Sequence, residues 1–139
     1  MLELVDRFQP RTERKFVERV VTAALAHAGR PDFEVSLLLT DDAEIAQLHE
    51  DFMGDPSPTD VMSFEMGDGA EVVVSVETAR RVATKHGTSM RAEVALYIVH
   101  GILHTVGFDD KDLVARRAMR EAEREILTRL RLEVRDVDA

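Results

Sequence analysis

The chain of 139 residues contains no cysteine, so it can form neither a disulfide nor a zinc site with thiolate ligands. A long apolar stretch is also missing. The longest apolar run covers the six residues from Val94 to Val99, whereas a membrane-spanning helix needs roughly 20. The N-terminus, Met-Leu-Glu-Leu-Val-Asp, lacks the basic region and apolar stretch of a secretory signal peptide. We therefore expect a cytoplasmic protein whose residues 1–139 form one domain, large enough to bury a core without covalent staples.

Helix and strand patterns alternate along the whole chain. A capping box of Asp41 and Glu44, for example, opens a helix in which Phe52 shares one apolar stripe with Ile45 and Leu48. These elements predict an α+β fold, an α/β-like sandwich of about four strands packed with about five helices. Strands are predicted at residues 2–6, 33–40, 59–66 and 71–75. The first predicted helix begins at Thr12 or Glu13 and is stopped by Gly29; further helices begin at 41, near 75 and near 112, and another carries residues 100 and 104.

Two histidines four residues apart are the most informative feature of the sequence. His100 and His104 are followed by Gly107 and by the pair Asp109 and Asp110. Residues i and i+4 share one face of a helix, so the two imidazoles can hold one metal ion between them. Gly107 can end the helix in a left-handed conformation, and the chain can then fold back to offer Asp110 as a third ligand. Three protein ligands leave one coordination position open, which is typical of a catalytic zinc site.

A simpler explanation competes with the metal, because HxxxH on a helix also occurs by chance among surface or core histidines. The apolar run from Val94 to Val99 favours the metal, since it places the histidines on a mostly buried helix where they need partners. The spacing also follows the metzincin protease motif HExxHxxGxxH, with Asp110 in the last liganding position. Gly101 stands where that motif has its general-base glutamate, so the usual water-activating carboxylate of a zinc protease is missing.

A second motif lies upstream, from Pro58 to Phe64, and reads PTDVxSF. Together with HGxLHxxGxD it resembles the YbeY family of bacterial metal-dependent endoribonucleases, which are linked to maturation of the small-subunit ribosomal RNA. The resemblance spans most of the chain. It also takes in Leu48, the segment from Glu71 to Ser75, Glu77, Ala79, Glu93 and Met119.

This resemblance implies a mixed sheet that backs a metal cleft, with one Zn²⁺ held on the buried helix and the turn that follows it. It implies cleavage of single-stranded RNA by attack of a metal-activated water on a phosphodiester, in maturation of the 3′ end of 16S rRNA and in ribosome quality control. The expected partners are ribosomal RNA, the small ribosomal subunit with its proteins, and an assembly GTPase, without a membrane. The expected metal ligands are His100, His104 and Asp110.

The same resemblance places Thr59 and Asp60 near the metal, as groups that contact the substrate or support the ligands. A local alternative is that Asp60 only caps or braces its loop. Asp109, beside the third ligand, could serve as the catalytic base or could orient one of the histidines through a hydrogen bond.

Three departures fall where the family places its chemistry. Asp110 replaces the usual third histidine, and because a carboxylate suits harder ions, Mn²⁺ or another divalent ion can compete with Zn²⁺. Met53 replaces an arginine, and methionine can neither carry charge nor donate a hydrogen bond to a phosphate. His49 replaces an asparagine, and we expect it in a surface or packing role on its helix. Reduced or differently assisted nuclease activity is therefore expected.

Basic residues are outnumbered, with 18 Lys and Arg against 27 Asp and Glu and a net charge of −9, which argues against indiscriminate RNA binding. Two basic groups stand out. One, on the last predicted helix, interleaves with Glu121, Glu123 and Glu125, which is typical of a solvated, salt-bridged face. The other is the better candidate for RNA contact because it flanks the start of the histidine helix. It consists of Arg80, Arg81, Lys85 and Arg91.

Two other functions remain open. A metallopeptidase-like hydrolase fits the metzincin spacing but lacks the glutamate at Gly101. A ribosome-assembly factor without catalytic activity would keep a structural metal, would tolerate Met53, and could dock a basic ribosomal protein on its acidic surface.

Overall fold

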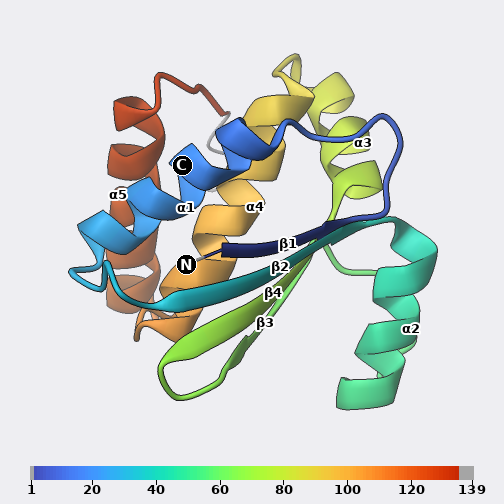
Figure 1. Ribbon diagram of the computed structural model, residues 1–139, viewed down its shortest axis with the longest axis horizontal. Helices are drawn as coiled ribbons and strands as arrows, with labels where there is room; N and C mark the ends of the chain where they lie inside the picture. Colours follow the sequence, from blue (N-terminus) through green and yellow to red (C-terminus); the bar gives the residue numbers. More distant parts are fainter. Residues whose placement is uncertain (1, 135–139) are drawn as a thin grey trace.

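The computed structural model describes residues 2–134, and its strands form one four-stranded sheet (Figure 1). The strand order is β1 (Leu2–Asp6), β2 (Glu34–Thr40), β4 (Gly69–Ser75) and β3 (Val61–Glu65). The first three strands of this order run parallel, and β3 pairs antiparallel with β4. The predicted mixed sheet of four strands is therefore confirmed.

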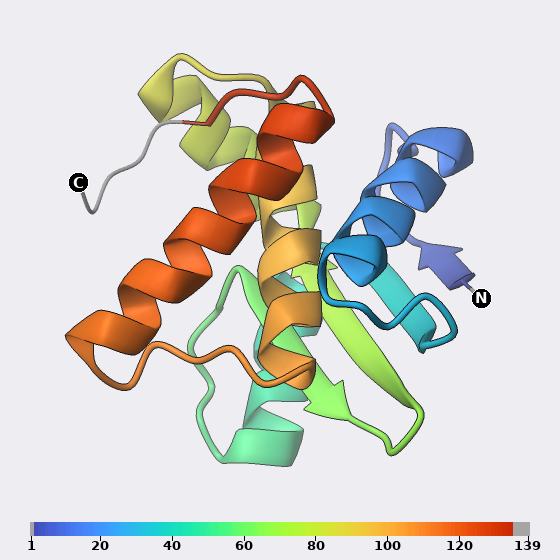
Figure 2. The same cartoon turned by 90° about the vertical axis from the view of Figure 1, so that its left-hand side faces the viewer.

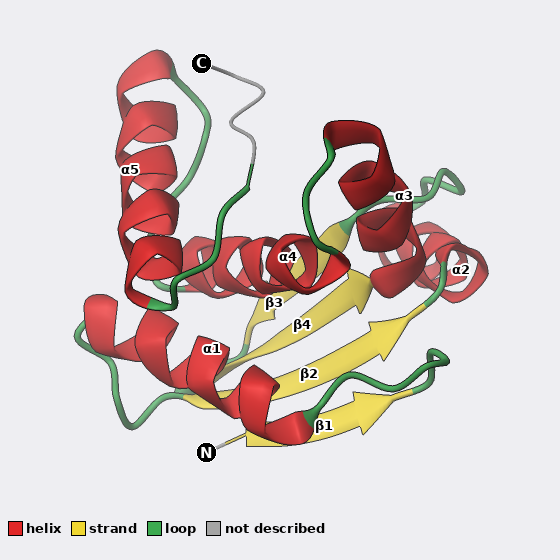
Figure 3. Cartoon of the chain, turned by 90° about the horizontal axis from the view of Figure 1, so that it is seen from above, coloured by secondary structure: helices red, strands yellow, loops and turns green. Residues whose placement is uncertain are grey.

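Residues 2–134 also contain five helices, which are placed unevenly on the two faces of the sheet (Figure 3). One face is covered by α1 and α4; α3 packs against α4, and α5 packs against both α4 and α1. Only α2 lies at the other face. The α+β fold predicted from the sequence is thus confirmed as a single domain. The helices are α1 (Arg14–His27), α2 (Asp42–Met53), α3 (Val76–His86), α4 (Met90–Thr105) and α5 (Leu113–Arg129).

The main core lies between the sheet and α4. Alternate residues of β2 and β4, such as Leu37 and Val72, point toward the helices, as the two-residue period of a strand requires. Helix α4 is apolar nearly all round because it has the sheet on one side and the other helices beside it, and its Ile98 and Ile102 are fully buried. Each such side chain contributes about 1.5–3 kcal/mol to folding. The histidines therefore sit on a helix that is buried nearly all round.

The second face of the sheet is covered over only part of its area. Ile45 of α2 is buried with Met62 and Val73, and Leu48 packs at the edge of this small cluster. Phe52 was expected on the same buried stripe, but its side chain is 66% exposed, so this expectation is wrong. Phe52 does not reach the buried cluster: with Leu38 and Val73 it lines an open hollow of about 310 Å³ beside the sheet. Its ring lies 5.5 Å from the ring of Phe64 between centroids.

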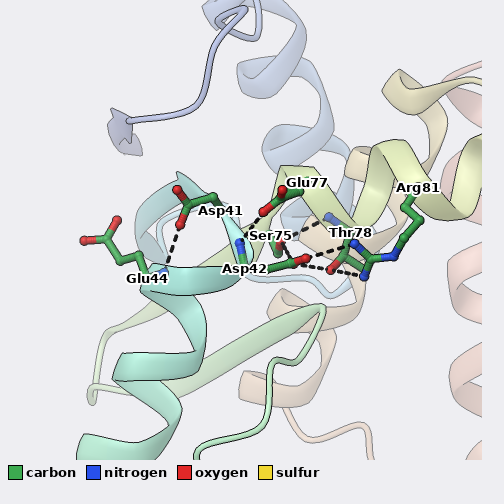
Figure 4. A network of polar contacts seen from close by, with 7 residues as sticks. All are labelled: Asp41, Asp42, Glu44, Ser75, Glu77, Thr78 and Arg81. Atoms are coloured by element: carbon green, nitrogen blue, oxygen red, sulfur yellow. Dashed lines mark hydrogen bonds and ion pairs between the residues drawn. The ribbon is translucent and has the colours of Figure 1, made fainter.

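The beginnings of α2 and α3 are tied together by side chains (Figure 4). The carboxylate of Asp42 accepts hydrogen bonds from the hydroxyls of Ser75 and Thr78 and pairs with Arg81 at 2.9 Å. In return, the backbone amide of Asp42 donates to the carboxylate of Glu77. Burial acts to raise the pKa of Asp42, but the three hydrogen bonds outweigh it and hold that pKa below its usual value.

The predicted capping box is only half formed. Asp41 does cap α2, since its side chain accepts from the amide of Glu44. Glu44 does not complete the box: its carboxylate instead accepts from the hydroxyl of Thr40 and pairs with Arg7. No helix within residues 2–134 has the length and apolar character to span a bilayer.

Candidate active site

A hollow of about 500 Å³ lies beside the C-terminal half of α4. It is bounded by that helix, by β3 and by the loop between α2 and β3, which runs alongside α4 in Figure 2. The two sequence motifs therefore meet in space, although they are far apart in the chain. The hollow is lined by His49, Met53, Thr59, Asp60, Val61, Met62, Ser63, Glu65, His100, His104 and Thr105.

The two histidines of α4 lie side by side at this hollow. Their ring centroids are 4.7 Å apart and the rings meet edge to face, as the i, i+4 spacing predicts. Gly101, between them in sequence, faces the sheet instead. A Cβ at this position would come within 2.7 Å of Val72 Cγ1 and 3.1 Å of Val61 Cγ2. A glutamate at position 101, as in zinc proteases, would therefore collide with the sheet.

His100 has a partner on another helix. Its Nδ1 lies 2.6 Å from Oε2 of Glu123, which α5 brings across α4. Glu123 is only 3% exposed. The sequence predicted it on a solvated helix face together with Glu121 and Glu125, and for Glu123 that prediction is wrong. The spacing of Met119, Glu123 and the other buried residues of α5 was the available signal, because it places this glutamate on the apolar stripe.

The third predicted ligand is not brought to the histidines. Helix α4 ends at Thr105, Gly107 takes the expected positive φ of 111°, and the amide of Phe108 donates to the carbonyl of Leu103. Beyond this turn Asp110 is exposed, and neither it nor Asp109 lines the hollow. Within residues 2–134 no three His, Asp or Glu side chains are grouped closely enough to hold a metal ion.

Asp109 has a local role in this loop. Its carboxylate accepts a hydrogen bond from the amide of Lys111, which is the geometry of an Asx turn. The structure thus places Asp109 as a brace of the segment that leads into α5, apart from the two histidines.

The kinds of side chain that line the hollow are nevertheless ones that bind divalent metal ions, although three of them are not grouped as ligands within residues 2–134. It combines the imidazoles of His100 and His104 with the carboxylates of Asp60 and Glu65, all of them groups that zinc and manganese accept as ligands. No lysine or arginine is among the described residues that line it. A phosphate entering the hollow would therefore need a bound cation to offset its charge and that of the carboxylates.

The loop before β3 borders the hollow as the family resemblance implied. Thr59 and Asp60 both line it, and the backbone carbonyl of Asp60 accepts from the amide of Ser75 in β4. His49 was expected in a surface or packing role. It does pack, since its Nδ1 lies 2.9 Å from the carbonyl oxygen of Ser57, but it also lines the hollow.

The three arginines of the basic group on α3 and α4 contact other side chains of the protein. Arg81 pairs with Asp42, and this contact raises the pKa of the Arg81 guanidinium. The guanidinium of Arg80 lies over the ring of Phe8, at 5.2 Å from its centroid. Lys85, on the last turn of α3, is exposed.

Arg91, the last member of this group, is turned toward α1. Its guanidinium lies 4.1 Å from the ring centroid of Phe16 and 3.8 Å from the carboxylate of Glu13. It precedes His100 by nine residues of α4, which corresponds to about 14 Å along the helix axis. The structure therefore does not gather these cations at the hollow.

Comparison with known proteins identifies the family. The family model described as endoribonuclease YbeY matches residues 5–131. The chain belongs to the YbeY family. An endoribonuclease YbeY of Aquifex aeolicus is 35% identical over 135 residues, which cover 91% of this chain and 90% of the relative. One of Desulforamulus reducens is 38% identical over 130 residues, which cover 84% of this chain and 85% of the relative.

The fold has also been seen before. The solution structure of a Thermotoga maritima protein named TM1509 superimposes with a TM-score of 0.67 at 22% sequence identity. The match covers 94% of this chain and 92% of that protein, so the two chains share a fold over nearly their whole length.

Proposed function

We propose that this chain is a metal-dependent endoribonuclease that hydrolyses single-stranded RNA in the hollow beside α4. One observation carries the proposal: the histidine pair His100 and His104 and the loop residues Thr59 and Asp60 line the same hollow. Membership of a family whose curated relatives are named endoribonucleases supports the reaction class.

The metal would be held by His100, His104 and Asp110, with Zn²⁺ as the first candidate and Mn²⁺ as the second. Asp110 is exposed on the loop after α4, so its participation requires that loop to change its path. When bound, the ion would supply positive charge against the phosphodiester and would lower the pKa of the attacking water.

The residues of the chain would perform the remaining steps. The Thr59 hydroxyl can donate a hydrogen bond to a phosphate oxygen, and Asp60 can accept the proton of the attacking water. A new bond forms from the water oxygen to phosphorus, the bond from phosphorus to the leaving sugar oxygen breaks, and that oxygen takes a proton from solvent. Asp109 would orient or assist this proton transfer from the same loop as Asp110.

The proposed substrate is ribosomal RNA, at the 3′ end of 16S rRNA, in maturation and ribosome quality control in the cytoplasm. The small ribosomal subunit with its proteins and an assembly GTPase are the proposed partners. The net charge of −9 fits selective RNA binding. Outside the hollow, we propose that the RNA backbone runs along one basic group of the protein. This group consists of Arg80, Arg81, Lys85 and Arg91.

The other two functions have less support. A metallopeptidase would need its glutamate at Gly101, where the packing against Val72 leaves no room. An assembly factor without catalytic activity is a distinct outcome of the experiment that follows.

The experiment measures bound metal by elemental mass spectrometry and cleavage of an unpaired RNA oligonucleotide, with and without a chelator. We expect about one metal ion per chain and chelator-sensitive cleavage. His104→Ala should lose both, whereas His27→Ala, at the half-buried end of α1, should keep both. Asp110→Ala should lower metal retention if Asp110 is the third ligand, and Asp109→Ala should lower it less.

Each alternative gives a different result. A metal that stays bound without any RNA cleavage would support the assembly factor, and cleavage of casein would support the peptidase. Cleavage of RNA that persists in His104→Ala or in excess chelator would contradict the proposed function.

A further inference from the structure

The buried carboxylate of Glu123 has no equivalent among its neighbours on α5. Glu121 and Glu125 are exposed to water, whereas Glu123 is 3% exposed and lies on the stripe that packs against α4. A buried carboxylate is costly unless it has a partner. Its partner here is the imidazole of His100, at 2.6 Å.

Packing alone does not account for a carboxylate at this position. The stripe of α5 is otherwise apolar, and replacing a buried charged pair by apolar side chains often leaves stability unchanged or raises it. A leucine at position 123 would therefore serve the docking of α5 at least as well. The rest of the stripe consists of Met119, Ala122, Ile126, Leu127 and Leu130.

The contact decides which nitrogen of His100 carries the proton. An ionised carboxylate can only accept a hydrogen bond, so Nδ1 must donate to it. In a neutral imidazole the other nitrogen, Nε2, then has a free lone pair. His100 lines the hollow with His104 beside it, and Nε2 is the nitrogen left for a ligand there.

We propose that Glu123 is a positioning residue that holds His100 in the Nδ1–H form and so presents Nε2 to a divalent metal ion in the hollow. This inference rests on the proposed function, because it assumes that His100 is a metal ligand. Glu123 acts only through His100: it fixes the orientation of the ring and makes the imidazole a stronger donor toward the metal.

The last helix thereby becomes part of the metal site without contributing a ligand. Residues 100 and 123 lie on different helices, so the orientation of the His100 ring depends on the docking of α5 against α4. A gap between these helices would release the ring even with both histidines intact.

The test compares the wild type with Glu123→Leu and Glu123→Gln, and uses Glu121→Gln as the control because Glu121 is exposed on the same helix. The first readout is the ¹⁵N spectrum of the His100 ring in metal-free protein at about pH 8.5, where a histidine of ordinary pKa is neutral. The second is the dissociation constant for Zn²⁺, measured by competition with a chelating dye.

We expect the wild type and Glu121→Gln to show His100 protonated at Nδ1. In Glu123→Leu the ring should carry a substantial share of the Nε2–H form, and zinc should bind about 10- to 100-fold more weakly. Glu123→Gln should fall between them, because its amide oxygen can still accept from Nδ1. If Glu123→Leu fails to fold, as judged by circular dichroism, the glutamine variant must itself show a weaker affinity for zinc than Glu121→Gln.

The proposal is overturned if the folded leucine variant keeps both the Nδ1–H form and a zinc affinity within about twofold of the wild type. A wild type that binds no divalent metal would instead refute the proposed function itself. Absence of RNA cleavage together with a zinc affinity that responds to Glu123→Leu would leave the role of Glu123 standing and remove only the nuclease.

Discussion

Gly101 of α4 lies directly against Val72 of β4: a Cβ built on the glycine would stand 2.7 Å from Val72 Cγ1. The absence of a side chain at position 101 lets α4 lie close to the sheet, and position 101 faces the sheet. The neighbouring His100 and His104 are therefore presented beside β3, while the residue between them serves packing.

We expect Gly101→Ala to lower the free energy of unfolding by about 1–3 kcal/mol, because the added methyl overpacks a rigid β-branched neighbour. The better helix propensity of alanine, worth about 1 kcal/mol, would offset only part of this loss. Urea denaturation measures the change. Val72→Ala in the same chain should relieve the collision, so the double variant should lose less than the sum of the two single changes.

Met53→Arg is expected to strengthen RNA cleavage. Met53 lines the hollow and is 59% exposed, and an arginine there can offer a bidentate hydrogen bond to a phosphate without entering the core. We expect KM for an unpaired RNA to fall by about tenfold, as one hydrogen bond to a charged group allows. Met66→Arg, on the exposed turn before β4, is the control for added charge. An equal effect of both changes would show that net charge alone acts.

Asp42→Asn is expected to cost stability at neutral pH and progressively less in acid. The folded-state pKa of Asp42 lies below its usual value, so its contribution is present above about pH 4 and is lost as the pH falls through the folded-state pKa. The difference in unfolding free energy between wild type and variant should therefore shrink below about pH 4. Denaturation across this range measures it, with Asp32→Asn at an exposed position as control. A difference that grows toward low pH would contradict the network of Figure 4.

Tyr97, the single tyrosine of the chain, is expected to stay un-ionised at a pH where an unfolded tyrosine ionises. Burial raises its pKa, and the charges of Glu93 and Asp60 raise it further. The free energy of unfolding is therefore unaffected by the ionisation of Tyr97 below about pH 10 and falls as the pH rises further. Above that pH the unfolded chain releases the phenol proton, whereas the folded protein still holds it. The absorbance of the phenolate reports this directly. Ionisation near pH 10 in the folded protein would show that the ring is solvated.

Periodicity predicted the fold well where an element buries one face and exposes the other. The alternating pattern of β2 correctly gives the face to which each side chain points, and the i, i+4 spacing correctly places His100 and His104 side by side. Phe52 shows the limit: its position on the stripe of α2 gives the direction of its side chain, but not whether the helix lies close enough to the sheet to bury it.

The site was harder to predict where a loop or a distant helix sets the geometry. The spacing of the motif matches Asp110 to the position of a third metal ligand. The path of the chain after Gly107, however, depends on backbone hydrogen bonds that cannot be read from the spacing. The burial of Glu123 was hard to predict, because glutamates are usually exposed and its sequence neighbours Glu121 and Glu125 are exposed. Only its place among the apolar residues of α5 indicated burial.

The Asp42 carboxylate occupies the edge of the sheet at which α/β proteins commonly bind anionic ligands. Anionic ligands of α/β proteins commonly bind where parallel strands end and helices begin, as β2 and β4 do ahead of α2 and α3. Here Asp42 takes the two hydroxyls and the guanidinium that an incoming phosphate would use. The protein carries its own covalently attached anion at that edge, so a phosphate approaching it would have to displace the Asp42 carboxylate from its three partners.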